Sequence, residues 1–314
     1  MATFNAVTGK KGKIQPGTVV LYLVIVLITF LILYPFWYCI AYSLSSSMAV
    51  MTQNVTFLPI GFTLENYQNV FKQNHLGSSF LVSVLRTLGG IVGTLLVTGL
   101  AAYAMSKKNM PGKRGLSLIL IIPMYIAGGL IPTYVWMYQL KLVNNFWVFI
   151  LPNCFWAFNM LLMRTYFEGI PESLEESARL DGAGDLTILF RIILPLSMPI
   201  VAVIAMYSGV WQWNAWYDAM LYITSPNLKP LQAILQEMIK ASSTSAQQMA
   251  QSGGQAMQNQ GSPEAVRMAT LVFTTLPIVC IYPFFQKYFV QGVMIGAVKA
   301  WATKLVLNGR FRLF

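Results

Sequence analysis

The sequence of 314 residues has few charged side chains. Lys, Arg, Asp and Glu make up 10% of it, whereas an average soluble domain has about 25%. Charge is absent from the runs 14–64, 87–106, 115–140, 142–163, 192–217 and 268–286. Each run is about long enough to cross the hydrocarbon core of a bilayer as a helix, which takes about 20 residues. This scarcity of charge excludes an ordinary soluble domain and predicts an all-α, polytopic membrane protein.

Residues that commonly carry chemistry are scarce as well. His75 is the only histidine, and Cys39, Cys154 and Cys280 lie in different apolar runs without metal-ligand spacing. The sequence contains no GxxxxGK[ST], the pattern of a phosphate-binding loop. We therefore expect no catalytic residue, metal site or cofactor in this chain. The net charge of +11 does not indicate nucleic-acid binding, because the basic residues lie in short loops instead of on one surface.

The charge-free runs predict six transmembrane helices. We place these helices at 18–44, 79–105, 116–138, 146–163, 192–213 and 265–285. With the N-terminus in the cytoplasm, fifteen Lys and Arg residues fall on the cytoplasmic side and four to six fall on the other. The positive-inside rule then predicts that both termini are cytoplasmic. The first span follows three lysines but is too long for a signal peptide and lacks a small-residue cleavage site, so we expect it to be retained.

The predicted spans divide the chain into four parts. The parts are a cytoplasmic N-terminal tail at 1–17, the first span with an outward segment at 18–78, a five-helix core at 79–290 and a cytoplasmic C-terminal tail at 291–314. Within the core, the outward segment 241–262 is uncharged and rich in Gln, Ser and Gly. Such a composition buries little apolar surface, so it predicts a flexible loop.

One predicted cytoplasmic loop, residues 168–191, carries eight charges, more than any other loop. Pro171 suits the first position of a helix, and the three glutamates that follow place negative charge near its positive end. We expect Gly182 to end this helix and Asp185 to cap a second helix that runs into Ile192. The pattern predicts a helix, a glycine turn and a second helix, although a solvated loop helix is the simpler alternative.

The same loop resembles the signature of the permeases of ABC importers. That signature reads E-A-A, three residues, G, nine residues and I-x-L-P, and the chain has Glu176-Ser177-Ala178, Gly182 and Ile192-x-Leu194-Pro195 at this spacing. The one departure is Ser177 in place of the first alanine. Three other segments resemble the carbohydrate-uptake branch, especially the Gram-positive lipoprotein or complex-polysaccharide permeases: FLPIGFTLENYQNVF, AAYAMSKKNMPGKRG and YPFFQKYFVQGVMIGAVK. The resemblance covers about residues 18–299.

This resemblance implies the type I (MetI-like) permease fold, with six transmembrane helices and a cytoplasmic coupling helix. In that family the loop docks in a groove of an ATPase. Glu176 would anchor the docking by charge, Ala178 and Ala183 would permit close approach, and Gly182 would make a turn where a side chain would clash or straighten the bend. The residues assigned to ATPase coupling are Glu176, Ser177, Ala178, Asp181, Gly182, Ala183, Ile192, Leu194 and Pro195.

The resemblance also implies partners and a function. The partners are a second homologous permease in a heterodimer, two cytoplasmic ATPase domains that bind ATP and Mg, and an extracytoplasmic substrate-binding lipoprotein. The implied function is import of a carbohydrate, an oligosaccharide, across the bacterial cytoplasmic membrane. An ion-coupled secondary transporter is the alternative, but the predicted spans lack the Asp and Glu residues typical of that class. A membrane scaffold or sensor that docks an ATPase is a third possibility.

Two features are candidates for the substrate path. Trp211, Trp213, Asn214 and Tyr217 lie near the outward end of the fifth span and combine aromatic faces with polar groups, as a sugar pocket requires. A belt of aromatic residues at the membrane interface is the favoured alternative. Arg86 lies inside the second span, where an arginine faces a cavity or extends to the interface because contact with lipid is costly.

Overall fold

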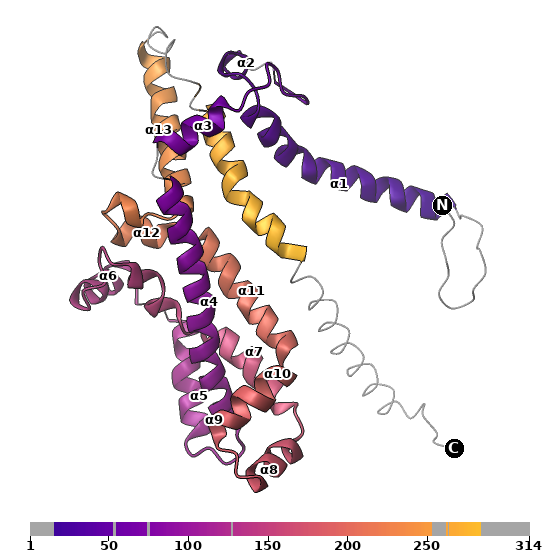
Figure 1. The fold of residues 1–314 in the computed structure, drawn as a ribbon, viewed down its shortest axis with the longest axis vertical. Helices are drawn as coiled ribbons and strands as arrows, with labels where there is room; N and C mark the ends of the chain where they lie inside the picture. Colours follow the sequence, from indigo (N-terminus) through magenta and orange to yellow (C-terminus); the bar gives the residue numbers. More distant parts are fainter. Residues whose placement is uncertain are drawn as a thin grey trace. The chain divides into compact units, whose positions relative to one another are not determined.

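The computed structural model describes residues 16–52, 55–73, 76–126, 128–252, 262 and 264–283. These residues form helices and turns, and none of them lies in a strand, which confirms the predicted all-α class. Figure 1 shows the helices along the chain. His75, the C-terminal tail and all of the N-terminal tail before Pro16 lie outside the described residues.

The chain divides into two compact units. One unit consists of Met1–Gln73 with Ile239–Phe273, and the other consists of Asn74–Met238 with Thr274–Phe314. The first unit contains α1 (Pro16–Ser43), α2 (Ser47–Met51) and α3 (Glu65–Gln73), together with part of the helix Glu264–Pro283. The sequence placed the first span at 18–44, and α1 matches this prediction closely.

The core of the first unit lies at the C-terminal end of α1. Ala41, Val50 and Ala265 are buried there. Asn66 of α3 is also buried, and its side-chain amide donates to the carbonyl oxygens of Ser43 at 3.0 Å and Ser45 at 2.8 Å. Within the described part of the chain, no residue buries the most apolar part of α1. A helix that is apolar on every side and uncovered by protein is suited to lipid or to another subunit.

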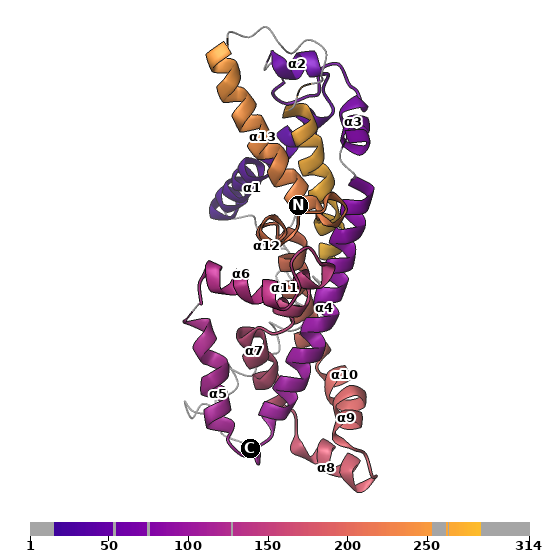
Figure 2. The same ribbon diagram turned by 90° about the vertical axis from the view of Figure 1, so that its left-hand side faces the viewer.

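The second unit is built on α4 (Leu76–Ser106), a helix of 31 residues. It packs against α7 (Ala157–Glu168) and α11 (Met198–Asn214), and its length is plain in Figure 2. The other elements are α5 (Lys113–Ile121), η1 (Ile122–Met124), α6 (Leu130–Gln139), η2 (Phe146–Phe149), η3 (Leu151–Asn153), α8 (Glu172–Leu180), α9 (Asp185–Ile188), η4 (Leu189–Ile193), α10 (Leu194–Leu196), α12 (Tyr217–Tyr222), η5 (Pro226–Leu228) and the start of α13 (Leu231–Ser252).

Glycines on α4 allow its neighbours to come close. A Cβ atom added to Gly89 would lie 2.6 Å from Cδ1 of Ile150, and one added to Gly93 would lie 2.7 Å from Sγ of Cys154. Real Cβ atoms essentially never make contacts this short. The four-residue spacing of these glycines follows the small-xxx-small pattern of membrane helices. It places the side chains of Ile150, between η2 and η3, and of Cys154, in the turn before α7, directly against the α4 backbone.

The described helices confirm some predicted spans and alter others. Three helices are long and apolar enough to cross a membrane by themselves: Pro16–Ser43, Leu76–Ser106 and Glu264–Pro283. Two bent pairs meet the same criterion jointly, with a bend of 48° before α7 and of 87° before α11. The fourth and fifth predicted spans correspond to these pairs, so neither is the single straight helix that the sequence predicted. Pro152, Pro195 and Pro199 lie near the two bends, where proline removes a backbone donor.

The third predicted span, 116–138, is wrong as a continuous helix. The structure divides it into α5, the single turn η1 and α6. Pro123 lies in η1 and cannot donate a backbone hydrogen bond. Gly129, the residue before α6, has φ of 83°, a backbone conformation outside the right-handed helix. Hydrophobicity alone could not reveal this break.

The prediction of a loop over 241–262 is also wrong for its first half. Helix α13 continues through Ser252, and the rest of the segment lies outside the described residues apart from Ser262. The helical part, 241–252, contains three Ala, three Gln and one Met residue, which have good helix propensity. Because α13 begins in a buried turn at Leu231, propagation from an existing helix needs no new nucleus.

Candidate functional site

The charged loop, residues 168–191, folds as two helices joined by a tight turn. Helix α8 follows Pro171 directly, and its first turn contains Glu172 and Glu175. At its end, the amide of Gly182 donates to Arg179 O at 3.0 Å, and the amide of Ala183 donates to Ala178 O at 2.9 Å. These two bonds, with φ of 81° at Gly182, form a Schellman motif.

The turn therefore confirms that the first helix ends at Gly182. The reason why glycine is needed there differs from the predicted one. A Cβ atom at Gly182 would meet no other atom within 4 Å, so the predicted clash is wrong. The positive φ is the constraint, because side chains of L-amino acids disfavour it. Helix α9 begins at Asp185, with Gly184 in the capping position that the sequence assigned to Asp185.

One side of α8 packs on its own chain. Ala178 is buried in a core with Tyr103 and Met105 of α4 and Met163 of α7, and Ala183 packs against the same core. Ala178 therefore packs closely within its own chain, and the close approach to an ATPase that the sequence predicted for it stays a prediction. Leu180, in contrast, has 90% of its surface exposed.

Ion pairs join the charged loop to the segment that follows α4. Lys107 pairs with Glu175, and Lys108 pairs with Glu172. The first pair is partly buried, whereas the second is largely exposed. The hydrogen bond and the attraction between Lys108 and Glu172 raise the pKa of Lys108 and lower the pKa of Glu172. Both shifts favour the charged forms at neutral pH.

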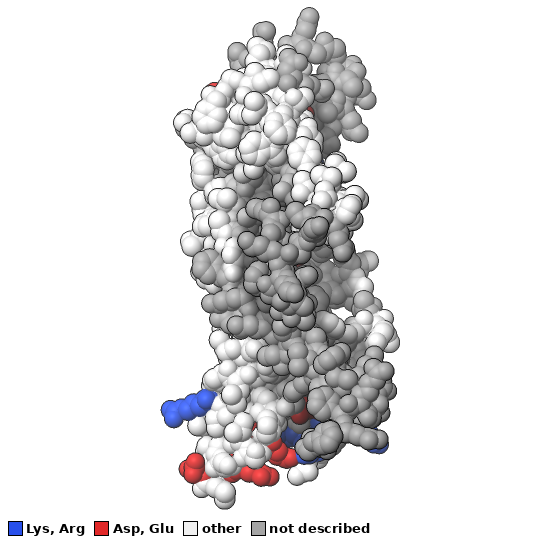
Figure 3. Space-filling view, turned by 90° about the vertical axis from the view of Figure 1, so that its right-hand side faces the viewer, with Lys and Arg blue, Asp and Glu red and all other residues white. Residues whose placement is uncertain are grey.

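Figure 3 shows acidic and basic side chains gathered at the lower end of one face, where α8 lies in Figures 1 and 2. Between α8 and residues 104–110 lies a hollow of about 490 Å³ with several charged side chains in its lining. Glu176, the residue expected to anchor a partner, lines this hollow together with Arg179. The loop therefore presents a charged surface held by its own chain.

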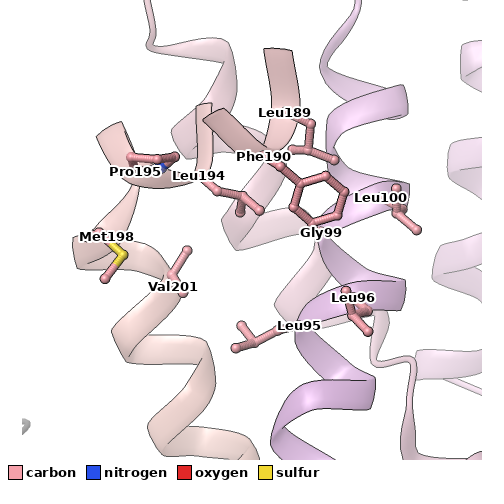
Figure 4. Close-up of a pocket in the computed structure, with 10 residues that line it drawn as sticks. All are labelled: Leu95, Leu96, Gly99, Leu100, Leu189, Phe190, Leu194, Pro195, Met198 and Val201. Carbon is pink, nitrogen blue, oxygen red and sulfur yellow. The ribbon is translucent and has the colours of Figure 1, made fainter. Parts of the chain in front are cut away.

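The charged loop continues without a break into the bent pair of helices that corresponds to the fifth predicted span. Helix α9 is followed by η4, a π-helical turn that contains Ile192, and then by α10, which contains Leu194 and Pro195. The direction changes by 87° before α11. Figure 4 shows Leu194 and Pro195 across an apolar groove from Gly99 of α4. The segment between the loop and α11 is thus a compact joint that faces α4 across this groove.

At the far end of α11, Arg86 of α4 is completely buried in a polar network. Its guanidinium donates to Asp218 Oδ2 at 2.6 Å and Oδ1 at 3.3 Å, to Ala215 O at 3.0 Å, and to Gln212 Oε1 at 3.1 and 3.2 Å. Its Cζ lies 4.2 Å from the centroid of the Phe149 ring. Arg86 therefore neither faces lipid nor extends to the interface, and it is satisfied by protein groups.

Asp218 links this network to an aromatic cavity of about 460 Å³. We use this name for the space lined by Leu130, Thr133, Met137, Val148, Pro152, Asn153, Trp211, Asn214, Ala215, Trp216, Tyr217, Asp218, Leu221 and Tyr222. Trp216 and Tyr217 meet edge to face, with centroids 5.7 Å apart. The cavity combines ring faces with a few polar groups, as sites for sugars and other small polar solutes do.

The structure brings together only some of the predicted substrate-path residues. Trp211, Asn214 and Tyr217 line the aromatic cavity. Trp213 points elsewhere, because it is buried and its indole donates to Thr274 O at 3.0 Å. Arg86 is not among the lining residues and is connected to the cavity through Asp218 and Ala215, which both line it. The sequence contained Asp218 and Gln212 but gave no sign that either pairs with Arg86.

The charged helix–turn–helix thus leads into a bent apolar helix, and the aromatic cavity lies at the far end of that helix. The chain belongs to the family described as binding-protein-dependent transport system inner membrane component, whose model matches residues 15–295. It is accordingly the permease component of an ABC importer and not an ion-coupled secondary transporter.

Similar proteins include two from Bacillus subtilis. The polygalacturonan/rhamnogalacturonan transport system permease protein YtcP is 35% identical over 268 residues, which cover 84% of this chain and 92% of that protein. Protein LplC is 36% identical over 266 residues, covering 84% and 88% of the two chains. A crystal structure of a bacterial ABC transporter that imports the acidic polysaccharide alginate matches with a TM-score of 0.79 at 30% identity. That match covers 88% of this chain and 99% of the other.

Proposed function

We propose that this permease imports a carbohydrate, an oligosaccharide, as one of two transmembrane subunits in a bacterial ABC importer. The observation that carries the proposal is the α8–Gly182–α9 turn joined directly to the bent segment before α11. The named substrates of the similar proteins, polygalacturonan, rhamnogalacturonan and alginate, support a carbohydrate. The aromatic cavity supports it independently, because ring faces and amide groups suit the apolar faces and hydroxyl groups of sugars.

In this proposal the charged loop is cytoplasmic and docks on an ATPase subunit. Glu176 supplies charge to the contact, and Leu180 supplies an exposed apolar side chain. Ser177 and Asp181 flank the docking surface, while Ala178 and Ala183 hold α8 to its own chain. ATP and Mg bind to the ATPase, because this sequence has no phosphate-binding loop.

Solute passage follows from the same arrangement. Closure of two ATPase domains moves the charged loops of two homologous permeases, this chain and a different partner. Because α9, η4 and α10 form one joint with α11, movement of the loop shifts the aromatic cavity at the other end of α11. Solute would arrive from an extracytoplasmic binding lipoprotein. Six spans and two cytoplasmic termini complete the proposal, with the broken α5–η1–α6 segment as the third span.

The test is purification of the tagged chain from its native membrane in mild detergent, followed by mass spectrometry of the proteins that accompany it. We expect a second, homologous permease and an ATPase with a Walker motif. Gly182→Asp should insert normally but lose the ATPase or uncouple ATP hydrolysis from uptake, because an L-residue at φ of 81° strains the turn.

Gly184→Asp is the matched control. It adds the same charge two residues away, at a φ of −76°, in the capping position of α9 where Asp is favoured. It should retain the ATPase and coupled uptake. Normal uptake by Gly182→Asp would refute this account of the loop, and recovery of the native chain without any ATPase would refute the proposed importer.

A further inference from the structure

Lys107 lies where α4 meets the charged loop. Helix α4 ends at Ser106, so Lys107 is the first residue beyond it. Its ammonium pairs with Glu175 on α8 and lies 3.8 Å from the centroid of the Tyr103 ring on α4. A cation over an aromatic face adds to the attraction of the ion pair. Lys107 thus contacts α4 and α8 at the same time.

The Lys107 pair is better shielded from water than its neighbour. The Lys107 and Glu175 side chains have 27% and 19% of their surface exposed, whereas Lys108 and Glu172 have 77% and 56%. Exposed pairs are weakened by water and salt and contribute little. Of the two pairs that join this segment to α8, the Lys107–Glu175 pair is therefore the stronger connection.

Helix α4 extends from this contact to the aromatic cavity. Arg86 and Lys107 are 21 positions apart in the sequence, which is about 32 Å along a helix. Between them α4 is one unbroken α-helix without proline, so it lacks the commonest cause of a sharp kink. At the cavity end, Arg86 binds Asp218 of α12 and the carbonyl of Ala215, which lies between α11 and α12. The two ends of this stretch are thus fixed to the charged loop and to the cavity wall.

We propose that Lys107 is a positioning residue that couples α8 to α4, so that a movement of the charged loop reaches the aromatic cavity through Arg86 and Asp218. This route is additional to the joint formed by α9, η4 and α10, and it rests on the proposed function. The buried core at Ala178 holds α8 to both α4 and α7. The Lys107–Glu175 pair joins α8 to the end of α4 and not to α7. A movement of α8 is therefore transmitted through this pair to α4.

The test measures movement at the cavity without needing the natural solute. Asn214 lines the cavity and is exposed, so Asn214→Cys provides a labelling site once Cys39, Cys154 and Cys280 are replaced by serine. The complete transporter is reconstituted in liposomes and reacted with a membrane-impermeant maleimide, with and without ADP and vanadate to hold the ATPase closed. Labelling of this chain is quantified by mass spectrometry.

We expect vanadate trapping to change the labelling rate in the Asn214→Cys background. Lys107→Glu should reduce that change at least about fivefold, the lower end of the usual coupling between distant sites, while the ATPase still co-purifies and turns over ATP. The exchanged pair Lys107→Glu/Glu175→Lys should restore the change. Lys108→Glu, which removes the exposed pair, should retain it. Glu175→Gln should reproduce the loss without adding a repulsive charge.

The possible results distinguish an error in the role of the Lys107–Glu175 pair from an error in the proposed ATPase-driven mechanism. A full response in Lys107→Glu and in Glu175→Gln would overturn the role of the pair. Loss of the response in both without restoration in the exchanged variant would also overturn it, because the charges would then not be the cause. If Lys107→Glu does not assemble, Glu175→Gln and Lys107→Gln decide the question alone. Failure of the Asn214→Cys background itself to respond would count against the proposed ATPase-driven mechanism instead.

Discussion

The buried pair of Arg86 and Asp218 supports a quantitative prediction about stability. Asp218→Asn removes the countercharge from a guanidinium that is completely buried. Breaking a buried ion pair by removing one partner typically costs about 3–5 kcal/mol, because the remaining charge is uncompensated. Gln212 and the Ala215 carbonyl still accept hydrogen bonds from Arg86, so we expect the lower part of this range.

The assay is thermal unfolding of the purified protein in detergent, followed by tryptophan fluorescence. A domain of 150–250 residues shifts its Tm by about 2–4 °C per kcal/mol, so Asp218→Asn should lower Tm by about 6–12 °C. The matched control is Glu172→Gln, which breaks the Lys108–Glu172 pair, whose side chains are 77% and 56% exposed, and Glu237→Gln breaks the intermediate pair of Lys229 and Glu237, at 23% and 41%. Pairs open to solvent contribute about 0–1 kcal/mol, so each of these variants should shift Tm by at most about 4 °C.

A double variant separates charge from packing. Arg86→Met/Asp218→Asn leaves no charge in the site and should recover much of the lost stability, as apolar replacements of buried pairs often do. Equal Tm shifts for Asp218→Asn and Glu172→Gln would refute the reasoning, because they would mean that the Arg86 site is accessible to water. A double variant less stable than Asp218→Asn would show that the hydrogen bonds of Arg86, and not its charge balance, stabilise the site.

Two further predictions concern the same end of α4. Gly90→Ala should lower stability by about 1–3 kcal/mol in the thermal assay, because its Cβ atom would lie 2.6 Å from Cγ of Gln212; Gly77→Ala, which meets no atom within 4 Å, should be neutral or slightly stabilising. Tyr217→Ala should raise the KM for oligosaccharide uptake about twofold to tenfold, as loss of one aromatic contact predicts. Trp147→Ala, an exposed residue that does not line the cavity, should leave that KM unchanged, and equal effects of the two would argue against the cavity as the path.

Local sequence patterns predicted the charged loop well. Pro171, the glutamates after it and Gly182 are start and stop signals that act within a few residues, and the structure places helix α8 and its turn accordingly. The first and second spans were also predictable, because α1 and α4 are long uninterrupted apolar helices. The break in the third predicted span depends on a few residues, such as Pro123 and Gly129. Mean hydropathy did not detect it, because the whole run is apolar.

The sequence by itself determined that this is an all-helical membrane protein with one charged helix–turn–helix, because hydrophobic length and helix signals are local properties. Only the tertiary structure decided what Arg86 and Trp213 do. Arg86 meets Asp218 across 132 positions of sequence, and Trp213 turns from the cavity to Thr274. Such pairings depend on which helix faces meet, and that choice follows from close packing at positions such as Gly90 and Gln212. The spacing of residues along the sequence does not show which helix faces meet.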